Sequence, residues 1–139
     1  MIKLKRTGRY SVDMTFDDEG LDMLLNALTE ETNNRLIRIE FDRAIINHKK
    51  TKFEHRDMLF VIDSNADNSE ISDTDEKLIW ILEAEDYEFA LFKFEESKKT
   101  GYFSPGEFID IKDRKVHGFT TIYCVFTNSS FDIESGIIR

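Results

Sequence analysis

Two kinds of apolar pattern alternate along the chain and predict its first elements. In residues 9–16, RYSVDMTF, every second residue is apolar, which is typical of a half-buried strand. Residues 17–20 are mostly acidic and favour the start of a helix. Four leucines then follow at the i, i+3, i+4, i+7 spacing of an amphipathic helix: Leu21, Leu24, Leu25 and Leu28. We therefore predict a strand and then a helix that ends near residue 31.

The rest of the chain predicts further strands and a second long helix. Strand patterns occupy residues 37–47, 58–63, 77–83 and 118–126. Residues 85–99 predict a helix with Tyr87, Ala90, Leu91 and Phe94 on one face. The sequence Ser104-Pro105-Gly106-Glu107 matches a capping box with proline at the first helical position, and it predicts a short third helix.

These elements give the order β-α-β-β-β-α-(short α)-β and an α+β fold. We expect one domain over residues 1–139, because the length is near the common domain size. Two main helices should pack on one face of a mostly antiparallel sheet of about five strands, with residues 128–139 as a tail of uncertain order. The expected buried positions are Val12, Met14, Phe16, Leu21, Leu24, Leu25, Leu28, Ile37, Ile39, Trp80, Leu82, Tyr87, Leu91, Phe94 and Cys124.

Negative charge is concentrated in one segment. The chain has 28 acidic and 19 basic residues, a net charge of −9. Residues 63–76, DSNADNSEISDTDE, contain no basic residue and six acidic ones: Asp63, Asp67, Glu70, Asp73, Asp75 and Glu76. We expect this segment to be a loop, and it has three interpretations: a metal-binding loop, a solvated linker, or a surface for a basic partner.

The composition argues against several kinds of chemistry. The acidic segment fails as a calcium loop, because Asn68 stands where glycine is needed and Thr74 where a bidentate glutamate belongs. The three histidines lack metal-ligand spacing, so no metal or cofactor is expected. The basic cluster in residues 48–56 is too short for nucleic-acid binding. Cys124 lies in an apolar strand, where burial raises a thiol pKa, so it is expected to be a small buried hydrophobe and not a nucleophile. The sequence has no motif for acyl transfer or nucleotide binding either, so we expect that the protein is not an enzyme.

The same features suggest a compartment. A single cysteine cannot form an internal disulfide, which fits a reducing cytoplasm. The longest apolar runs are five residues, too short to span a bilayer, and the first residues lack the apolar stretch of a signal peptide. We expect a cytoplasmic protein that contacts no membrane.

Phe89 and Phe92 point away from the apolar face of the second helix. One interpretation is that the short third helix or the tail covers them. The other is that they form a binding or self-association surface, so they join the six acidic residues as candidate partner-binding residues. We expect a monomer or a weak dimer.

Two stretches of the chain resemble a known family. RYSVDMTF leading into DDEGLDMLLNAL, and KLIWILEAEDYEFALFKFEESKKTGYFSPGEF, resemble immunity proteins of bacterial polymorphic-toxin and contact-dependent growth inhibition systems. The likeness covers roughly residues 9–31 and 77–108, and it is architectural, with no signature residue carried over. It implies a non-enzymatic inhibitor that binds the C-terminal domain of a cognate toxin. If that toxin is a nuclease, the acidic loop would fit its basic groove.

A different function class stays open. The chain could be a small enzyme or ligand-binding domain that uses a cleft between the second helix and the last strand. Glu107, Asp110 and His117 would then be the polar residues of the site. A deep pocket lined by these three residues would favour this alternative, and a flat surface would disfavour it.

Overall fold

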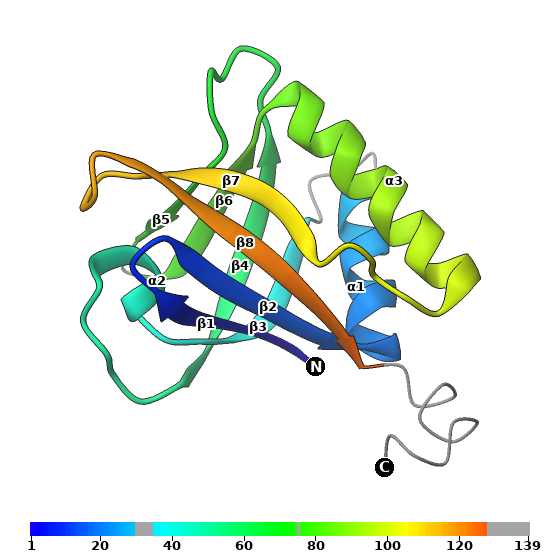
Figure 1. The fold of residues 1–139 in the computed structure, drawn as a ribbon, viewed down its shortest axis with the longest axis horizontal. Helices are drawn as coiled ribbons and strands as arrows, with labels where there is room; N and C mark the ends of the chain where they lie inside the picture. The colour runs from blue at the N-terminus through cyan, green and yellow to red at the C-terminus, as the bar shows by residue number, and fades with distance from the viewer. Residues whose placement is uncertain (30–34, 75, 128–139) are drawn as a thin grey trace.

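The computed structural model describes residues 1–29, 35–74 and 76–127 (Figure 1). These residues form three helices and one sheet of eight strands. The helices are α1 (Asp18–Thr29), α2 (Ala44–Asn47) and α3 (Ala84–Thr100). The strands are β1 (Ile2–Gly8), β2 (Ser11–Asp17), β3 (Leu36–Phe41), β4 (Glu54–Ile62), β5 (Glu70–Asp73), β6 (Lys77–Leu82), β7 (Glu107–Asp113) and β8 (Gly118–Thr127).

The sheet is mixed and curves until its two edge strands meet. Its strand order is β5-β6-β4-β3-β1-β2-β8-β7. Neighbours β1–β3, β2–β8 and β4–β6 are parallel, and the other four pairs are antiparallel. At the two edges, Ser69 forms a parallel bridge to Ile111, and the N–H of Lys112 donates to the carbonyl of Ser69 at 2.8 Å. The sheet is therefore a nearly closed barrel (Figure 1).

Helices α1 and α3 lie side by side on one flank of the curved sheet (Figure 1). The Tyr87 hydroxyl on α3 donates to the carbonyl of Leu28 on α1 at 2.9 Å. A cluster of phenylalanines joins α3 to the sheet: the ring of Phe16 lies 5.7 Å from that of Phe94 and 6.2 Å from that of Phe103. No helix in the described ranges is long and apolar enough to cross a membrane.

The α+β class is confirmed, but the predicted arrangement of two helices on a mostly antiparallel sheet, with that element order, is wrong. The structure has strand β1 before the first predicted strand. In β1, Ile2, Leu4 and Arg6 face the interior, so a charged residue occupies the third inward position. Arg6 is buried because its Nη2 lies 3.0 Å from Oδ2 of Asp113. An arginine at an inward position interrupts the alternation of apolar residues, so the sequence pattern does not predict this strand.

Three other segments differ from the prediction. Residues 44–47, expected to extend a strand, form α2, because the carboxylate of Asp42 accepts hydrogen bonds from the N–H groups of Ala44 and Thr51 and turns the chain. The expected acidic loop contains β5. The expected third helix is absent from residues 104–107, where the chain instead enters β7. An irregularity between Glu107 and Asp110 leaves both Phe108 and Ile109 buried, which breaks the alternation of a strand.

The helix predicted over residues 85–99 is confirmed as α3, with Ala90 and Phe94 buried on its apolar face. Glu83 caps its N-terminus by accepting from the N–H of Asp86, and Gly101 ends it with a positive φ of 83°. Most expected core positions are buried. Three of them, Leu25, Tyr87 and Leu91, are only partly buried and pack against the core.

Candidate functional site

The six acidic residues of segment 63–76 do not share one environment. Asp63 begins the connection from β4 to β5, and its Oδ1 accepts from the N–H of Asn65 at 2.9 Å, as in an Asx turn. Glu70 opens β5, and its Oε2 lies 3.2 Å from Nη2 of Arg114. Asp67 and Glu76 are exposed. Asp75 lies outside the described residues.

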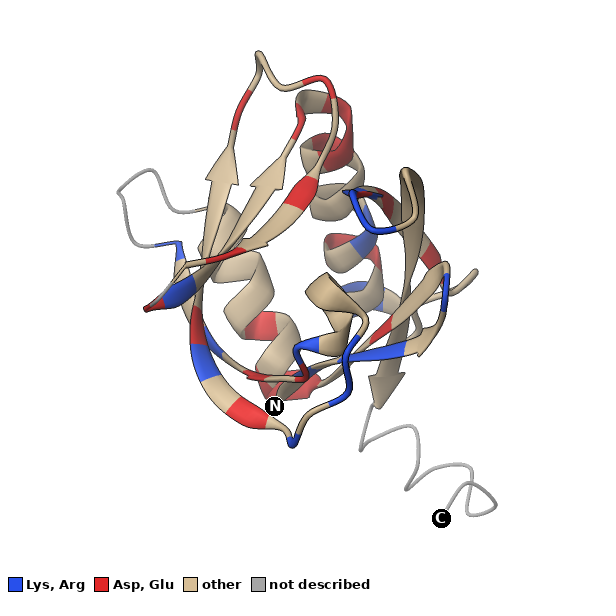
Figure 2. Cartoon of the chain, turned by 90° about the vertical axis from the view of Figure 1, so that its left-hand side faces the viewer, with Lys and Arg blue, Asp and Glu red and all other residues tan. Residues whose placement is uncertain are grey.

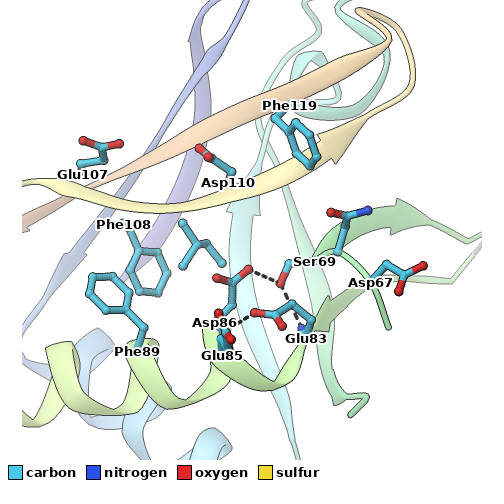
Figure 3. A pocket seen from close by; sticks show the side chains of 12 residues that line it. Asp67, Ser69, Glu83, Glu85, Asp86, Phe89, Glu107, Phe108, Asp110 and Phe119 are labelled. Atoms are coloured by element: carbon cyan, nitrogen blue, oxygen red, sulfur yellow. Dashed lines mark hydrogen bonds between the residues drawn. The ribbon is translucent and has the colours of Figure 1, made fainter. Parts of the chain in front are cut away.

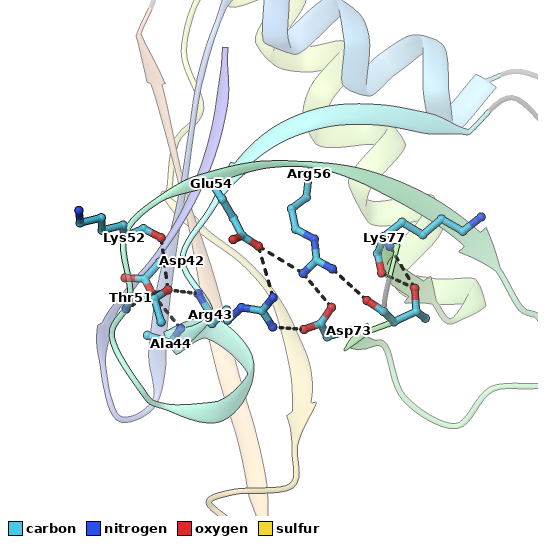
Figure 4. Close-up of polar contacts among 10 residues, drawn as sticks. Asp42, Arg43, Ala44, Thr51, Lys52, Glu54, Arg56, Asp73 and Lys77 are labelled. Atoms are coloured by element: carbon cyan, nitrogen blue, oxygen red, sulfur yellow. Dashed lines mark hydrogen bonds and ion pairs between the residues drawn. The ribbon is translucent and has the colours of Figure 1, made fainter.

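Asp73 is held by two arginines of the same chain (Figure 4). Its two carboxylate oxygens each lie 2.8 Å from an arginine nitrogen, Oδ2 from Nη1 of Arg43 and Oδ1 from Nη1 of Arg56. Glu54 also approaches both guanidinium groups, at 3.6 and 3.5 Å. Arg56 further donates to the carbonyl of Thr74 at 2.9 Å, and its side chain is 9% exposed. The charge of Asp73 therefore stabilises the edge of the sheet and is neutralised within the chain.

A concave acidic site lies beside this segment. A cavity of about 500 Å³ opens between the connection before β5, the first turns of α3, and strands β7 and β8 (Figure 3). Six of its lining residues carry carboxylates, and none of the described lining residues is basic. We call it the acidic pocket. It is lined by Asp67, Asn68, Ser69, Glu83, Glu85, Asp86, Phe89, Glu107, Phe108, Ile109, Asp110 and Phe119.

The distribution of charge agrees with this position. In Figure 2, acidic segments gather where the β4–β5 connection faces the first turns of α3. Basic segments gather instead in the connection between α2 and β4, which contains Lys49, Lys50 and Lys52. The acidic pocket therefore opens where acidic segments gather, away from the basic connection between α2 and β4.

Ser69 fixes one wall of the acidic pocket. Its hydroxyl donates to Oδ2 of Asp86 at 2.6 Å and accepts from the N–H of Glu83 at 3.1 Å (Figure 3). Its carbonyl accepts from Lys112 on β7. One residue, 1% exposed, therefore joins the segment before β5 to the start of α3 and to β7. The backbone of Ser69 closes the barrel and its side chain shapes the pocket, so both depend on the same residue.

The electrostatics of the pocket act on Asp86. Burial raises the pKa of Asp86, and the neighbouring carboxylates of Glu83 and Asp110 raise it further, while the hydrogen bond from Ser69 opposes the rise. A positive charge that enters the pocket stabilises the ionised form of such a carboxyl group, because it offsets the repulsion from the other carboxylates. The pocket therefore favours a cationic group.

Aromatic rings supply the apolar part of the pocket. The ring of Phe89 lies 6.1 Å from that of Phe108, which in turn packs 5.2 Å from Phe94 in the core. Phe119 on β8 is 48% exposed and faces the pocket from the other side (Figure 3). Carboxylates beside aromatic rings suit a cation on an apolar stem, such as a lysine or arginine side chain.

The two phenylalanines singled out on α3 have different surroundings. Phe89 is 39% exposed and is partly covered by Phe108 of β7, not by the predicted third helix. Phe92 is 60% exposed, the highest value of any large hydrophobic side chain in the described residues. The tail that was the other expected cover lies outside those residues.

The residues of the alternative cleft are only partly brought together. Glu107 and Asp110 line the acidic pocket, and Oδ1 of Asp110 accepts from the Thr121 hydroxyl at 2.6 Å. His117 instead lies in the turn between β7 and β8, with a φ of 52°, and does not line the pocket. Cys124 is buried, and burial raises its pKa well above the ordinary value, as expected for a small core residue. Within the described ranges, no three His, Cys, Asp or Glu side chains are placed to hold a metal ion.

Several pocket residues were missed by the sequence analysis: Ser69, Glu83, Glu85, Asp86, Phe108 and Phe119. Glu85 and Asp86 were visible only as acidic residues at the start of the predicted second helix, and Glu83 only as the last residue of a predicted strand. No sequence pattern marks Ser69 or Phe119 as a site residue, because only the closure of the barrel brings them to the pocket.

In comparisons with known proteins, no family model, no curated protein and no solved structure gave a significant match. The geometry of the acidic pocket, together with the chemistry of its side chains, is therefore the basis for a functional proposal.

Proposed function

We propose that this protein binds a basic protein domain by accepting a lysine or arginine side chain in the acidic pocket, and that it acts as an immunity-type inhibitor of a toxin. The observation that carries the binding proposal is a cavity of about 500 Å³ with six carboxylate residues and three phenylalanines in its lining. The inhibitor role is supported by the resemblance of residues 9–31 and 77–108 to immunity proteins.

The chemistry of the pocket favours such a ligand in two ways. An entering ammonium or guanidinium group meets Asp86, whose pKa is raised by burial and by the neighbouring charges of Glu83 and Asp110. The methylene stem of the same side chain lies against the rings of Phe89 and Phe119. Bidentate pairing with carboxylates makes arginine the better fit.

The charge of the whole molecule favours a macromolecular partner. The net charge of −9 attracts a basic domain over distances of about a Debye length, roughly 8–10 Å at physiological salt. Such attraction raises association rates more than it raises affinity.

The test uses the C-terminal domain of a toxin encoded beside this gene. Association and dissociation rates are measured for the wild type, for Glu107→Gln/Asp110→Asn, and for the control Glu40→Gln/Asp57→Asn, which removes the same charge from β3 and β4. We expect the pocket variant to lose at least about tenfold in affinity, since charge-assisted contacts contribute about 1.5–3 kcal/mol each. The control should change little. Equal affinities for all three proteins would contradict the proposal.

A second candidate function is binding of a small organic cation. It is favoured by the size of the cavity, which falls in the range that holds small ligands, and by the raised pKa of Asp86 within it. Calorimetry with spermidine and with arginine amide distinguishes the two. Micromolar binding of either compound at physiological salt, without binding of the toxin domain, would favour this second function.

A further inference from the structure

An acidic stripe surrounds Phe92 on the outer face of α3. At 100° per residue, the residues at positions 85, 88, 92, 95, 96 and 99 fall on one side of the helix. They are Glu85, Glu88, Phe92, Glu95, Glu96 and Lys99. The most exposed large hydrophobic side chain of the described chain therefore lies in the middle of four glutamates.

A groove lies along this stripe. It measures about 440 Å³ and is lined by Glu88, Leu91, Phe92, Glu95, Glu96, Lys99 and Thr100. Its apolar surface comes from Leu91 and Phe92, and its lining holds three glutamates and one lysine. One of the glutamates, Glu96, is paired within the chain, because its Oε1 lies 3.3 Å from Nζ of the buried Lys93. An exposed ring between acidic residues has the composition of an interface anchor, apolar at its centre and charged at its rim.

The stripe continues directly from the acidic pocket. Glu85 and Phe89 belong to the pocket lining, and Glu88 and Phe92 each follow three residues later on the same helix. On a helix, residues three apart are neighbours on the surface. A partner with one basic side chain in the pocket therefore has the stripe within reach of its next residues.

We propose that the stripe binds a basic segment of the partner protein, whose apolar side chain packs on Phe92 while its lysines or arginines face Glu88 and Glu95. This inference rests on the proposed function and extends its contact surface along α3. A second copy of this chain is a poorer occupant, because a symmetric contact would bring the same glutamates of both copies against each other. The charge of the stripe thus selects a basic partner.

The test compares two peptides of equal charge. The first is acetyl-KKLKKLKK-amide, and in the second both leucines are replaced by serine. Calorimetry measures both against the wild type, Phe92→Ala, Glu107→Gln/Asp110→Asn, and the control Leu36→Ala, which truncates a 48% exposed residue on β3. Because Phe92 is largely exposed, its truncation leaves the core unchanged.

We expect the wild type and Leu36→Ala to bind the leucine peptide about tenfold more tightly than the serine peptide, and Phe92→Ala to bind both equally. The pocket variant should weaken both peptides and keep their ratio. If Phe92→Ala keeps the full preference for the leucine peptide, the proposal that the stripe binds the partner is contradicted, while the proposal for the acidic pocket stands. If the pocket variant binds as the wild type does, the proposed function fails instead.

Self-association is measured with the same proteins by light scattering over a range of concentrations. A constant monomer mass for the wild type supports a partner of different sequence. A mass that rises with concentration in the wild type but not in Phe92→Ala would assign the stripe to a second copy and overturn the inference.

Discussion

The hydroxyl of Ser69 donates to Oδ2 of Asp86 at 2.6 Å and thereby joins the edge of the barrel to the first turn of α3. Ser69 also forms the bridge to Ile111 that brings β5 and β7 together. The acidic pocket lies where these two connections meet. The closure of the barrel and the electrostatics of the candidate site thus depend on one residue, the first through its backbone and the second through its hydroxyl.

Replacement of Ser69 by alanine should therefore have two effects. Loss of a buried donor and acceptor is expected to lower the free energy of unfolding by about 1–3 kcal/mol. Because the hydroxyl favours the ionised form of Asp86, its removal should also raise the pKa of that carboxyl group. Urea denaturation measures the first effect and NMR titration of the side-chain carboxyl carbon the second. Ser64→Ala, at an exposed position, is the control, and an unchanged Asp86 pKa in Ser69→Ala would contradict the account.

The buried pair of Arg6 and Asp113 predicts a second effect on stability. Asp113 Oδ2 lies 3.0 Å from Arg6 Nη2, and both side chains are almost fully buried. Asp113→Asn leaves the guanidinium without its charge partner and should cost about 3–5 kcal/mol of unfolding free energy. The exposed pair of Arg38 and Asp57 is the control, and Asp57→Asn should cost less than about 1 kcal/mol.

The same aspartate predicts how stability depends on pH. Burial alone would raise the pKa of Asp113, but hydrogen bonds with Thr120, His48 and the N–H of Lys115, and the charge of Arg6, outweigh burial and lower it below 3.8. The stabilisation by Asp113 is therefore fully present above that value and is lost as pH falls through the lower pKa of the folded protein. Thermal unfolding at a series of acidic pH values should show a smaller loss of stability in Asp113→Asn than in the wild type. Parallel curves for the two proteins would contradict this assignment.

Residues of segment 63–76 should separate into structural and exposed groups. Asp73→Asn removes the ion pairs with Arg43 and Arg56, and we expect a loss of about 1–3 kcal/mol in the free energy of unfolding. Glu76→Gln, at an exposed position, should change it by less than about 0.5 kcal/mol. Chemical denaturation of the two variants checks the difference. Equal stabilities would show that the Asp73 ion pairs contribute nothing measurable.

Cation binding in the acidic pocket should depend on the protonation of Asp86. The pKa of Asp86 is raised above 3.8, so the group is neutral at a pH where an ordinary aspartate is ionised. Affinity for a cationic peptide should therefore increase as pH rises through that raised value. Calorimetry between about pH 4 and pH 7 should show a weaker pH dependence for Asp86→Asn than for the wild type. Identical profiles would show that Asp86 does not contact the cation.

The elements that were predicted correctly depend on local patterns. The apolar pattern that predicts helix α3 and strands β6 and β8 lies within the residues of each element. Strand β1 does not, because the partner that allows Arg6 to be buried is Asp113, 107 residues away. For the same reason, only some of the residues that line the acidic pocket could be predicted from the sequence. Asp67, Phe89, Glu107 and Asp110 were named for separate reasons, and only the closure of β5 on β7 places them around one cavity.

The central claim is that the acidic pocket binds the cationic group of a partner. The most direct measurement is a titration of the isotope-labelled protein with an acetylated and amidated hexa-arginine peptide, followed by backbone amide NMR. We predict that the largest chemical-shift changes occur at Ser69, Asp86 and Asp110 and disappear in Glu107→Gln/Asp110→Asn. Changes centred on Asp63 or Glu76 instead, and equal in the wild type and the variant, would contradict the claim.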